Sequence, residues 1–264
     1  MSIRLRSALA LAALLAATVP ALAIKGGAAS SDPAGIRRSV VQIKGPGGTQ
    51  CTGTVVSRRL VLTAAHCFLA GRGDYKIRAL NPDFRFRFAM GVQVAVHPEF
   101  DVRALGTGAP LNDIALLRSD RDFPNWLTPV TLAASVPNDN QFVDVLAAGF
   151  GMNRDRRIAS AGTLREMHFA MLDKVYDPSK QLFLIDREGK LKARSARTGI
   201  CRGDSGGPVF RRTASGTVLV GVISAVIAGR GYDCGAITAV TAVPAYRSYI
   251  QEMANKAGST VVFR

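Results

Sequence analysis

Short apolar runs separated by turn residues recur along the chain, and each run predicts a β-strand. Segment 84–88 alternates phenylalanine with arginine, which is typical of a strand with one buried face and one face in water. The other predicted strands are 40–43, 54–56, 60–62, 92–96, 114–117, 142–147, 164–171, 218–223 and 236–243. Because parallel strands need crossover helices and no alternating helices are predicted, the pattern indicates an all-β fold of antiparallel strands.

The one long helical pattern comes at the end of the chain. Pro244 precedes segment 245–256 and Gly258 follows it, as expected for residues that begin and end a helix. The apolar face of this helix would carry Tyr246, Tyr249, Ile250 and Met253. We therefore expect two antiparallel β-barrels packed side by side, with a boundary near 120–140, followed by one C-terminal helix.

Residues 1–23 have the pattern of a secretory signal peptide. Arg4 and Arg6 precede 17 uncharged residues, which end in Ala21-Leu22-Ala23. An uncleaved membrane anchor is the alternative, but the run is shorter than the roughly 20 residues of a membrane-spanning helix. We expect cleavage after Ala23, an exported domain of residues 24–264, and no membrane span within that domain.

Composition and charge narrow the class of protein further. The chain has 264 residues, 48% of them hydrophobic and 20% charged, which excludes a disordered chain. Its net charge of +15 favours anionic surfaces or polymers as nonspecific partners. The basic residues are dispersed and few aromatic residues lie among them, so we expect no specific recognition of nucleic acid.

Four cysteines bear on the compartment and on metal binding: Cys51, Cys67, Cys201 and Cys234. In an oxidising compartment, pairing is the first interpretation and metal ligation the second. Of the three possible connectivities we favour Cys51–Cys67 and Cys201–Cys234, because nearest-neighbour pairing closes two short loops. The three histidines are scattered and form no H-E-x-x-H motif, so no metal site and no cofactor is predicted.

Three short motifs carry residues with possible chemistry: L-T-A-A-H-C at 62–67, N-D-I-A-L-L at 112–117 and R-G-D-S-G-G-P at 202–208. Taken alone, His66 and Asp113 are more simply interpreted as structural residues at strand ends. Ser205 is harder to interpret in this way. The glycines on both sides of it allow a sharp turn and bring backbone N–H groups near a bound carbonyl, as acyl transfer requires.

Taken together and in this order, the motifs resemble those of the trypsin/chymotrypsin family of serine peptidases. The I-K-G-G start at Ile24, C-T-G-T before the histidine and G-F-G at 149–151 match the family too. Separations of 42, 47 and 92 residues between Ile24, His66, Asp113 and Ser205 also suit it. The resemblance implies an all-β fold of two packed six-stranded antiparallel β-barrels with a C-terminal helix. It also implies a secreted serine endopeptidase that acts on protein or peptide substrates.

The resemblance implies a role for each residue of the motifs. His66 would take the proton of the Ser205 hydroxyl, and Asp113 would hold the imidazole in the required tautomer. The backbone N–H groups of Gly203 and Ser205 would form the oxyanion hole. The reaction would pass through an acyl-enzyme intermediate on Ser205.

The resemblance further implies an activation step. In the family, an amino terminus freed by cleavage inserts beside the aspartate that precedes the catalytic serine. These two residues are Ile24 and Asp204 in this sequence. Removal of the leader after Ala23 would expose Ile24 directly, so that export itself would complete the activation.

The predicted substrate pocket departs from the trypsin pattern. Gly199 stands where a trypsin-like enzyme has the aspartate that binds Arg or Lys, so the usual counter-charge is missing. Ile200 would make the floor apolar, Ser224 would begin the segment that pairs with the substrate backbone, and Val226 would narrow the pocket. Small or medium apolar side chains are therefore expected before the cleaved bond, because a substrate cation would be buried without a partner.

A second class of function stays open at this point. The same fold with its excess of positive charge could be a catalytically idle protein that binds anionic surfaces, because fold alone does not imply activity. We favour the enzyme, because idle relatives usually lose a residue of the triad and this chain keeps all three.

Overall fold

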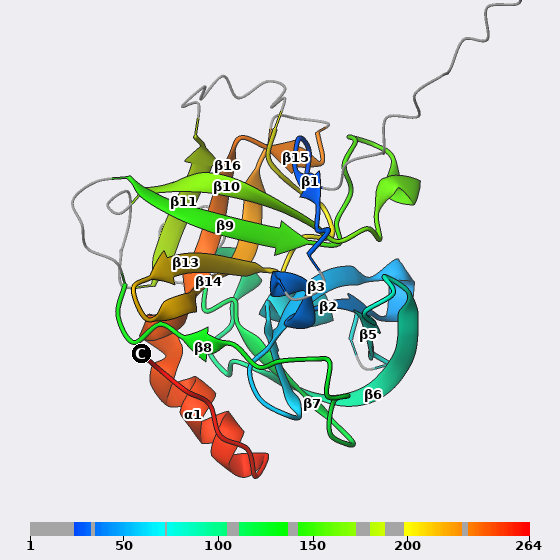
Figure 1. Ribbon diagram of the computed structural model, residues 1–264, viewed down its shortest axis with the longest axis vertical. Coiled ribbons are helices and arrows are strands. Elements are labelled where there is room, and N and C mark those ends of the chain that lie inside the picture. The colour runs from blue at the N-terminus through cyan, green and yellow to red at the C-terminus, as the bar shows by residue number, and fades with distance from the viewer. Residues whose placement is uncertain are drawn as a thin grey trace, which may run out of the picture.

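The computed structural model describes most of the chain beyond its first 23 residues, and the predicted leader lies outside the described residues. The described ranges are 24–32, 35–71, 73–104, 111–136, 142–172, 180–187, 198–228 and 232–264. Figure 1 shows two curved sheets side by side, with one helix at the lower edge of the molecule. No helix among these described ranges is long and apolar enough to cross a membrane.

The first sheet is a closed barrel of six antiparallel strands in the order β2-β3-β4-β7-β6-β5. Its strands are β2 (Val40–Lys44), β3 (Gln50–Val55), β4 (Leu60–Thr63), β5 (Lys76–Leu80), β6 (Phe86–Val96) and β7 (Ala115–Ser119). Strand β4 pairs with β7 in a register that places Thr63 opposite Ala115. This register matters for the site, because it aligns the end of β4 with the start of β7.

The second sheet also forms a ring of six antiparallel strands. They are β9 (Val143–Gly149), β10 (Arg165–Leu172), β11 (Gln181–Asp186), β13 (Pro208–Thr213), β14 (Gly216–Ile227) and β16 (Ile237–Ala242). Strand β10 pairs with both β9 and β11, which closes the path β11-β16-β14-β13-β9. The predicted pair of antiparallel barrels is confirmed.

Short elements complete the sheets. Strand β1 (Ala28–Ala29) pairs with β10, β8 (Thr131–Leu132) runs parallel to β14, and β12 (Ile200–Cys201) pairs with β15 (Cys234–Gly235). The 3-10 helices are η1 (Ile36–Arg38), η2 (Pro46–Gly48), η3 (Ala65–Phe68), η4 (Val102–Ala104), η5 (Ile158–Ser160) and η6 (Val243–Tyr246). The predicted boundary at 120–140 falls partly outside the described residues and stays a prediction.

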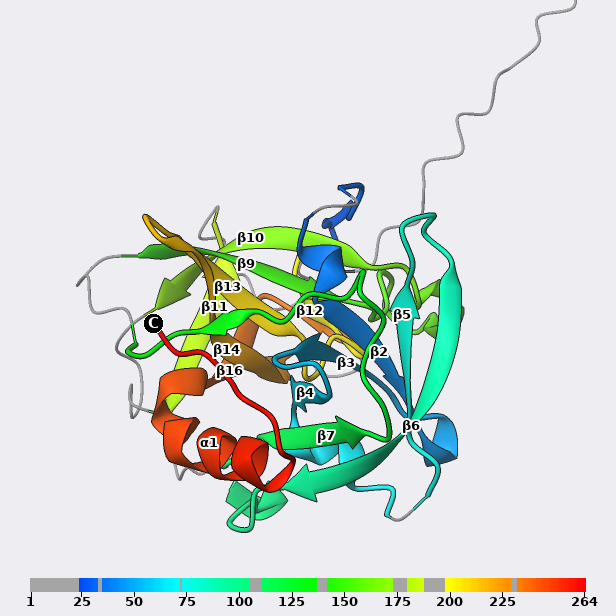
Figure 2. The same ribbon diagram turned by 60° about the horizontal axis from the view of Figure 1, so that its bottom comes forward.

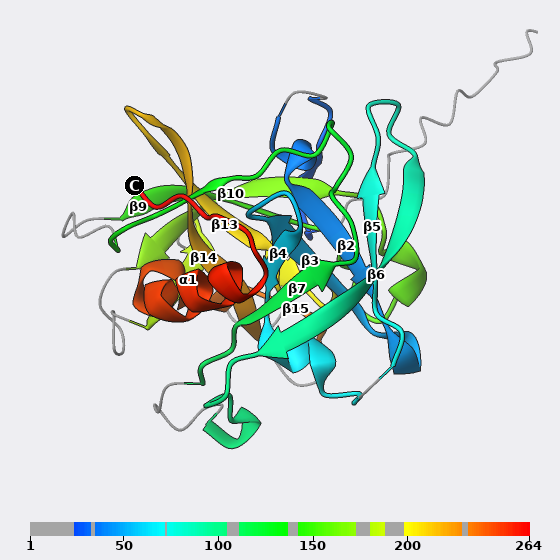
Figure 3. The same cartoon turned by 90° about the horizontal axis from the view of Figure 1, so that it is seen from below.

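The predicted C-terminal helix is present, with a different beginning. Residues Val243–Tyr246 form the 3-10 turn η6, and the α-helix α1 spans Arg247–Lys256. Seen from two other sides, α1 lies near β14 and β7 (Figure 2, Figure 3). Its buried residues Ile250 and Ala254 belong to the same apolar cluster as the core of the first barrel. The helix therefore joins the end of the chain to the first barrel, while a separate cluster fills the second.

The predicted start of the alternating strand at 84–88 is two residues early. Phe84 has φ +61°, which belongs to a turn and not to a strand, and β6 begins at Phe86. The Phe84 ring is 46% exposed and lies 3.7 Å beneath the guanidinium of Arg37. Contact with a cation, and not burial inside the barrel, therefore accounts for this phenylalanine.

Both predicted disulfides are confirmed. Cys51 bonds to Cys67, and Cys201 bonds to Cys234. The first disulfide links β3 to η3, which carries His66. The second joins directly opposed residues of β12 and β15. Each disulfide therefore lies against one of the three segments that carry the candidate chemistry, the first beside His66 and the second beside the loop of Ser205.

Candidate active site

The register of the first barrel brings His66 and Asp113 to one place. His66 follows Thr63 by three residues in η3, and Asp113 precedes Ala115 by two. Because Thr63 and Ala115 lie opposite each other in antiparallel strands, the residue after β4 and the residue before β7 meet at the same end of the barrel. Two residues 47 positions apart thus become neighbours through strand pairing alone.

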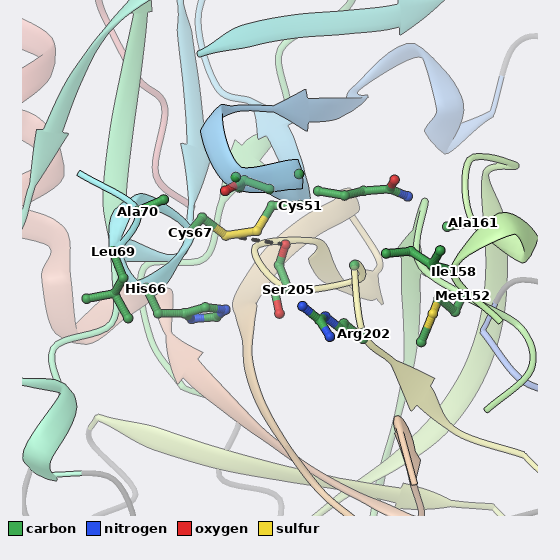
Figure 4. Close-up of a pocket in the computed structure, with 15 residues that line it drawn as sticks. Cys51, His66, Cys67, Leu69, Ala70, Met152, Ile158, Ala161, Arg202 and Ser205 are labelled. Carbon is green, nitrogen blue, oxygen red and sulfur yellow. Dashed lines mark hydrogen bonds between the residues drawn. A yellow bond between two sulfur atoms is a disulfide. The ribbon is translucent and has the colours of Figure 1, made fainter. Parts of the chain in front are cut away.

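The two side chains form a close pair. The Asp113 Oδ2 atom lies 2.7 Å from His66 Nδ1, and Asp113 Oδ1 accepts the backbone N–H of His66 at 2.8 Å. Asp113 is buried, whereas the His66 side chain is 27% exposed. In Figure 4 the imidazole of His66 points toward Ser205. A carboxylate on Nδ1 leaves Nε2 as the nitrogen that is able to accept a proton from the cavity side.

The second barrel supplies further partners to Asp113. The Ser224 hydroxyl donates to Oδ2 at 2.5 Å, and the Thr241 hydroxyl donates to the backbone carbonyl of Asp113 at 3.0 Å. Burial raises the pKa of Asp113, but hydrogen bonds from His66 and Ser224 and the charge of His66 bring the pKa below its usual value. Asp113 is therefore held ionised at the junction of the two barrels.

The backbone before Asp113 is fixed by residues that the motifs did not single out. Asn112 has φ +50°, a left-handed conformation that asparagine tolerates better than most residues. The Tyr246 hydroxyl donates to Asn112 Oδ1 at 3.0 Å, and Asn112 Nδ2 donates to the carbonyl of Glu99 at 3.0 Å. Because Tyr246 lies in η6, the C-terminal part of the chain contributes directly to the position of Asp113.

Ser205 lies in a turn that needs glycine on both sides. Gly203 has φ +97° and Gly206 has φ +79°. A Cβ at Gly203 would lie 2.9 Å from the Cα of Gly151, and a Cβ at Gly206 would lie 2.0 Å from Thr63 Oγ1. The backbone carbonyl of Ser205 accepts the N–H of Thr52 at 2.8 Å. The turn is therefore packed against the first barrel, close to the strand that leads to His66.

His66, Gly203 and Ser205 line one cavity of about 390 Å³. In Figure 4, Leu69, Ala70 and the Cys51–Cys67 disulfide lie on one side of Ser205, and Met152, Ile158 and Arg202 lie on the other. None of the residues that line the cavity is acidic. The Sγ atoms of Cys51 and Cys67 lie within 4.8 Å of a His66 nitrogen, but both are consumed in the disulfide and offer no thiolate to a metal.

Asp204 is a second buried carboxylate with a different environment. Its described hydrogen bonds come from the backbone N–H groups of Gly151 at 2.8 Å and Cys201 at 2.9 Å. Burial raises the pKa of Asp204 to about 7, and the two N–H groups do not offset this effect. The two donors are too few to stabilise a fully buried charge, and no charged partner of this carboxylate lies among the described residues.

The segment that begins at Ile24 lies close to this loop. Ile24 is buried in the core cluster of the second barrel, and the Lys25 carbonyl accepts the N–H of Gly199 at 2.8 Å. Ile24 has φ +41°, which is a genuine outlier for a β-branched residue. The predicted amino-terminal residue is thus inside the protein and in a strained conformation while residue 23 is still attached.

Three of the four predicted pocket residues, Gly199, Ile200 and Val226, lie around Gly235, whereas the described contact of Ser224 is with Asp113. Gly199 has φ +149°, and a Cβ there would lie 2.1 Å from the carbonyl oxygen of Gly235. A Cβ at Gly235 would lie 2.5 Å from Val226 Cγ1. Ile200 is buried and pairs with Gly235, and Ser224 binds Asp113. The isopropyl group of Val226 therefore lies against Gly235, the residue that pairs with Ile200.

Comparison with known proteins assigns the family. The sequence profile of the family named Trypsin matches residues 24–250. The chain belongs to the trypsin family. It is 29% identical over 204 residues to CLIP domain-containing serine protease B15 of Anopheles gambiae, and the match covers 66% of this chain and 53% of that protein. It thus spans about half the length of this relative.

Two further relatives of this trypsin-family chain are also named as proteases of this kind. The first is trypsin beta of Drosophila erecta, 26% identical over 197 residues, which cover 74% of this chain and 73% of that protein. The second is serine protease 41 of Homo sapiens, 27% identical over 217 residues, which cover 70% and 62%. The expected family is confirmed, and the family and the names of these relatives support the class of serine-type endopeptidases, which are hydrolases.

Proposed function

We propose that this trypsin-family chain hydrolyses peptide bonds with His66, Asp113 and Ser205 as its catalytic residues. The observation that carries the proposal is the pair of His66 with the buried Asp113 at 2.7 Å, on the same cavity as Ser205. A serine hydroxyl is a weak nucleophile and needs an adjacent base. The carboxylate on Nδ1 keeps the opposite nitrogen free to act as that base.

The reaction proceeds in two halves. Ser205 Oγ attacks the substrate carbonyl carbon while His66 Nε2 takes its proton, and the N–H groups of Gly203 and Ser205 stabilise the oxyanion. The C–N bond then breaks, and His66 returns the proton to the leaving amine. A water molecule, deprotonated by His66, attacks the acyl-enzyme and releases the carboxylate product and the free Ser205 hydroxyl.

The proposed substrates carry a small apolar side chain before the cleaved bond. Val226 lies against Gly235, and Gly199 brings no charge to the pocket, so neither a long side chain nor a cation is accommodated well. A peptide-library profile tests this. We expect alanine-sized residues to dominate at the cleaved position, and a profile dominated by Arg or Lys contradicts the proposal.

The proposed active form begins at Ile24, after export and removal of residues 1–23. Two observations support this start: the buried Asp204 carboxylate has no charged partner among the described residues, and Ile24 has a φ angle of +41°, which is strained for an isoleucine. An ammonium group at Ile24 would supply the missing partner. Removal of residue 23 would also abolish the φ angle of Ile24, and with it the strain.

A fluorophosphonate probe tests the catalytic assignment directly. We expect the chain that begins at Ile24 to be labelled at Ser205 and to hydrolyse peptide amides. The Ser205→Ala variant should take up no label and should lose roughly 10⁴ to 10⁶ in kcat. Equal turnover by the two proteins contradicts the proposal. Absence of labelling in a folded chain that begins at Ile24 instead favours the idle protein that binds anionic surfaces through its excess of positive charge.

A further inference from the structure

Lys25, the second residue of the I-K-G-G motif, forms an ion pair for which the motif itself gives no reason. Its Nζ atom lies 2.8 Å from Asp155 Oδ2, and the two residues are 130 positions apart in the chain. Their side chains are only 25% and 17% exposed. The contact therefore joins the first residues of the domain to the connection between β9 and β10, in a setting with restricted access to water.

Asp155 also holds the wall of the candidate pocket. Its other oxygen, Oδ1, accepts the backbone N–H groups of Asp233 at 2.9 Å and Cys234 at 3.0 Å. Burial raises the pKa of Asp155, but the hydrogen bond from Lys25 and those two N–H groups bring its pKa below the usual value. One ionised carboxylate thus binds the amino-terminal segment on one side and the start of β15 on the other.

The backbone of Lys25 contacts the opposite wall. Its carbonyl accepts the N–H of Gly199, the residue that precedes β12. Strands β12 and β15 are themselves joined by the Cys201–Cys234 disulfide. Lys25 therefore reaches Gly199 through its backbone and Cys234 through Asp155. The oxyanion loop at Gly203 begins two residues after Cys201.

We propose that Lys25 and Asp155 are positioning residues, which fix both walls of the substrate pocket and the oxyanion loop once Ile24 is free. The inference rests on the proposed function of the site. Asp204 would bind the ammonium group of Ile24, and Asp155 binds the next side chain. Two carboxylates would then hold the new amino terminus, Asp204 through the ammonium group of Ile24 and Asp155 through the side chain of Lys25.

The test compares Lys25→Met and Asp155→Asn with the unaltered chain. Both substitutions keep the size of the side chain and remove its charge. We expect kcat/KM toward a peptide amide to fall by about tenfold in each, and the double variant to lose little more than either single variant. Lys25→Arg should restore most of the activity, because it keeps the charge.

A matched control separates this effect from general stability. Lys256 forms a surface ion pair with Glu252 at 2.6 Å, far along the chain from the pocket, so Lys256→Met removes the same kind of charge without the expected loss of kcat/KM. Mass spectrometry must show that each variant begins at Ile24, because Lys25 adjoins the proposed cleavage site. A fall in kcat/KM at an unchanged concentration of fluorophosphonate-reactive sites is the result that supports positioning.

The inference and the proposed function fail in different ways. If the unaltered chain takes up no fluorophosphonate, the proposed function is wrong. If the unaltered chain is labelled but Lys25→Met and Asp155→Asn both keep kcat/KM within twofold, the positioning role of Lys25 and Asp155 is wrong and the proposed function stands. If either variant does not fold, Lys25→Arg and increasing salt provide the comparison. We then expect added salt to lower kcat/KM more in the unaltered chain than in whichever charge-removing variant does fold.

Discussion

Two aspartates of this chain are both buried, yet their pKa values are shifted in opposite directions. Asp113 accepts the His66 N–H, faces the His66 ring and binds the Ser224 hydroxyl, and its pKa lies below the usual value. Asp204 binds two backbone N–H groups, and burial raises its pKa to about 7. Burial alone therefore does not decide the ionisation of a carboxylate. The number and charge of its partners do so.

The comparison separates the part of the site that is complete from the part that is not. The partners of Asp113 lie on both barrels and are fixed by strand pairing, so its environment forms together with the fold. The missing partner of Asp204 is a positive charge, which the proposed amino terminus at Ile24 would provide. The His66–Asp113 pair of the proposed site would thus be formed before residues 1–23 are removed. The oxyanion loop would be ordered only after their removal.

The largest expected effect follows from the complete carboxylate. Asp113→Asn removes the charge that orients His66, and we expect kcat to fall by about 10⁴-fold, as in other sites of this geometry, while the protein stays folded. Steady-state hydrolysis of a peptide amide measures the loss. Asp144→Asn is the matched control, because Asp144 also faces a histidine, His168, at 2.9 Å but on the exposed surface. Similar losses in the two variants would show that Asp113 has no special role.

The incomplete carboxylate gives the next effect. In the processed chain, Asp204→Asn leaves the Ile24 ammonium buried without its partner, at a cost of about 3 to 5 kcal/mol. If the whole cost falls on the active conformation, activity falls by roughly 10² to 10⁴-fold, at about 1.4 kcal/mol for each factor of ten. A chain that retains Ala23 should lose a similar amount, because it has no ammonium group at Ile24. Peptide hydrolysis by the two variants, each of confirmed amino terminus, measures the losses, and full activity in the chain with Ala23 contradicts the activation proposal.

Stability should depend on pH with opposite signs for the two aspartates. In the uncut chain, the folded-state pKa of Asp204 is about 7 against 3.8 for an ordinary aspartate, so the folded state binds the proton more tightly. The contribution of Asp204 to the stability of the chain that retains residue 23 should therefore be fully present below about pH 4, and up to about 4 kcal/mol of it should be lost as the pH rises to about 7. Asp113, with a lowered pKa, contributes stability that is lost as the pH falls.

Urea unfolding between pH 4 and pH 8 measures this dependence, in a Ser205→Ala chain that retains Ala23 and therefore does not digest itself. The same chain with Asp204→Asn lacks the titrating group and should lose less stability as the pH rises. Parallel curves for the two chains would show that Asp204 is not desolvated in the way the fold indicates.

The sequence predicted most strands of the two barrels but missed β5, β11 and β13, although β11 contains the continuous apolar run 182–185. Strand β13 was missed because it begins with Pro208 and carries Arg211 and Arg212, which are unusual in a buried strand. Phe84 was placed in a strand because alternation does not distinguish a ring that faces the core from one that lies against an arginine. Local pattern therefore predicts the existence of an element better than its ends.

The candidate site shows the same division. His66, Asp113 and Ser205 were identified from motifs, because their neighbours in the sequence are diagnostic of the family. Asp155 and Tyr246 were not, since their importance comes from partners more than a hundred positions away in the chain. Lys25 was included only as part of the I-K-G-G motif. A contact between distant segments leaves no local signal, so only the fold could show what Lys25 binds.

The smallest expected effect tests whether the second barrel contributes to the complete carboxylate. Ser224→Ala removes the hydroxyl that donates to Asp113 Oδ2 at 2.5 Å. A hydrogen bond to a charged group contributes about 1.5 to 3 kcal/mol, but His66 still binds the carboxylate, so we expect kcat to fall by about tenfold and the lowered pKa of Asp113 to rise. Acid unfolding of the variant should begin at a higher pH for the same reason. Ser39→Ala is the control, because Ser39 is also buried and donates to the carbonyl of Thr128 at 2.6 Å, away from the site. If Ser224→Ala changes kcat no more than Ser39→Ala does, Asp113 is held by the first barrel alone, and the junction of the barrels only shields it from water.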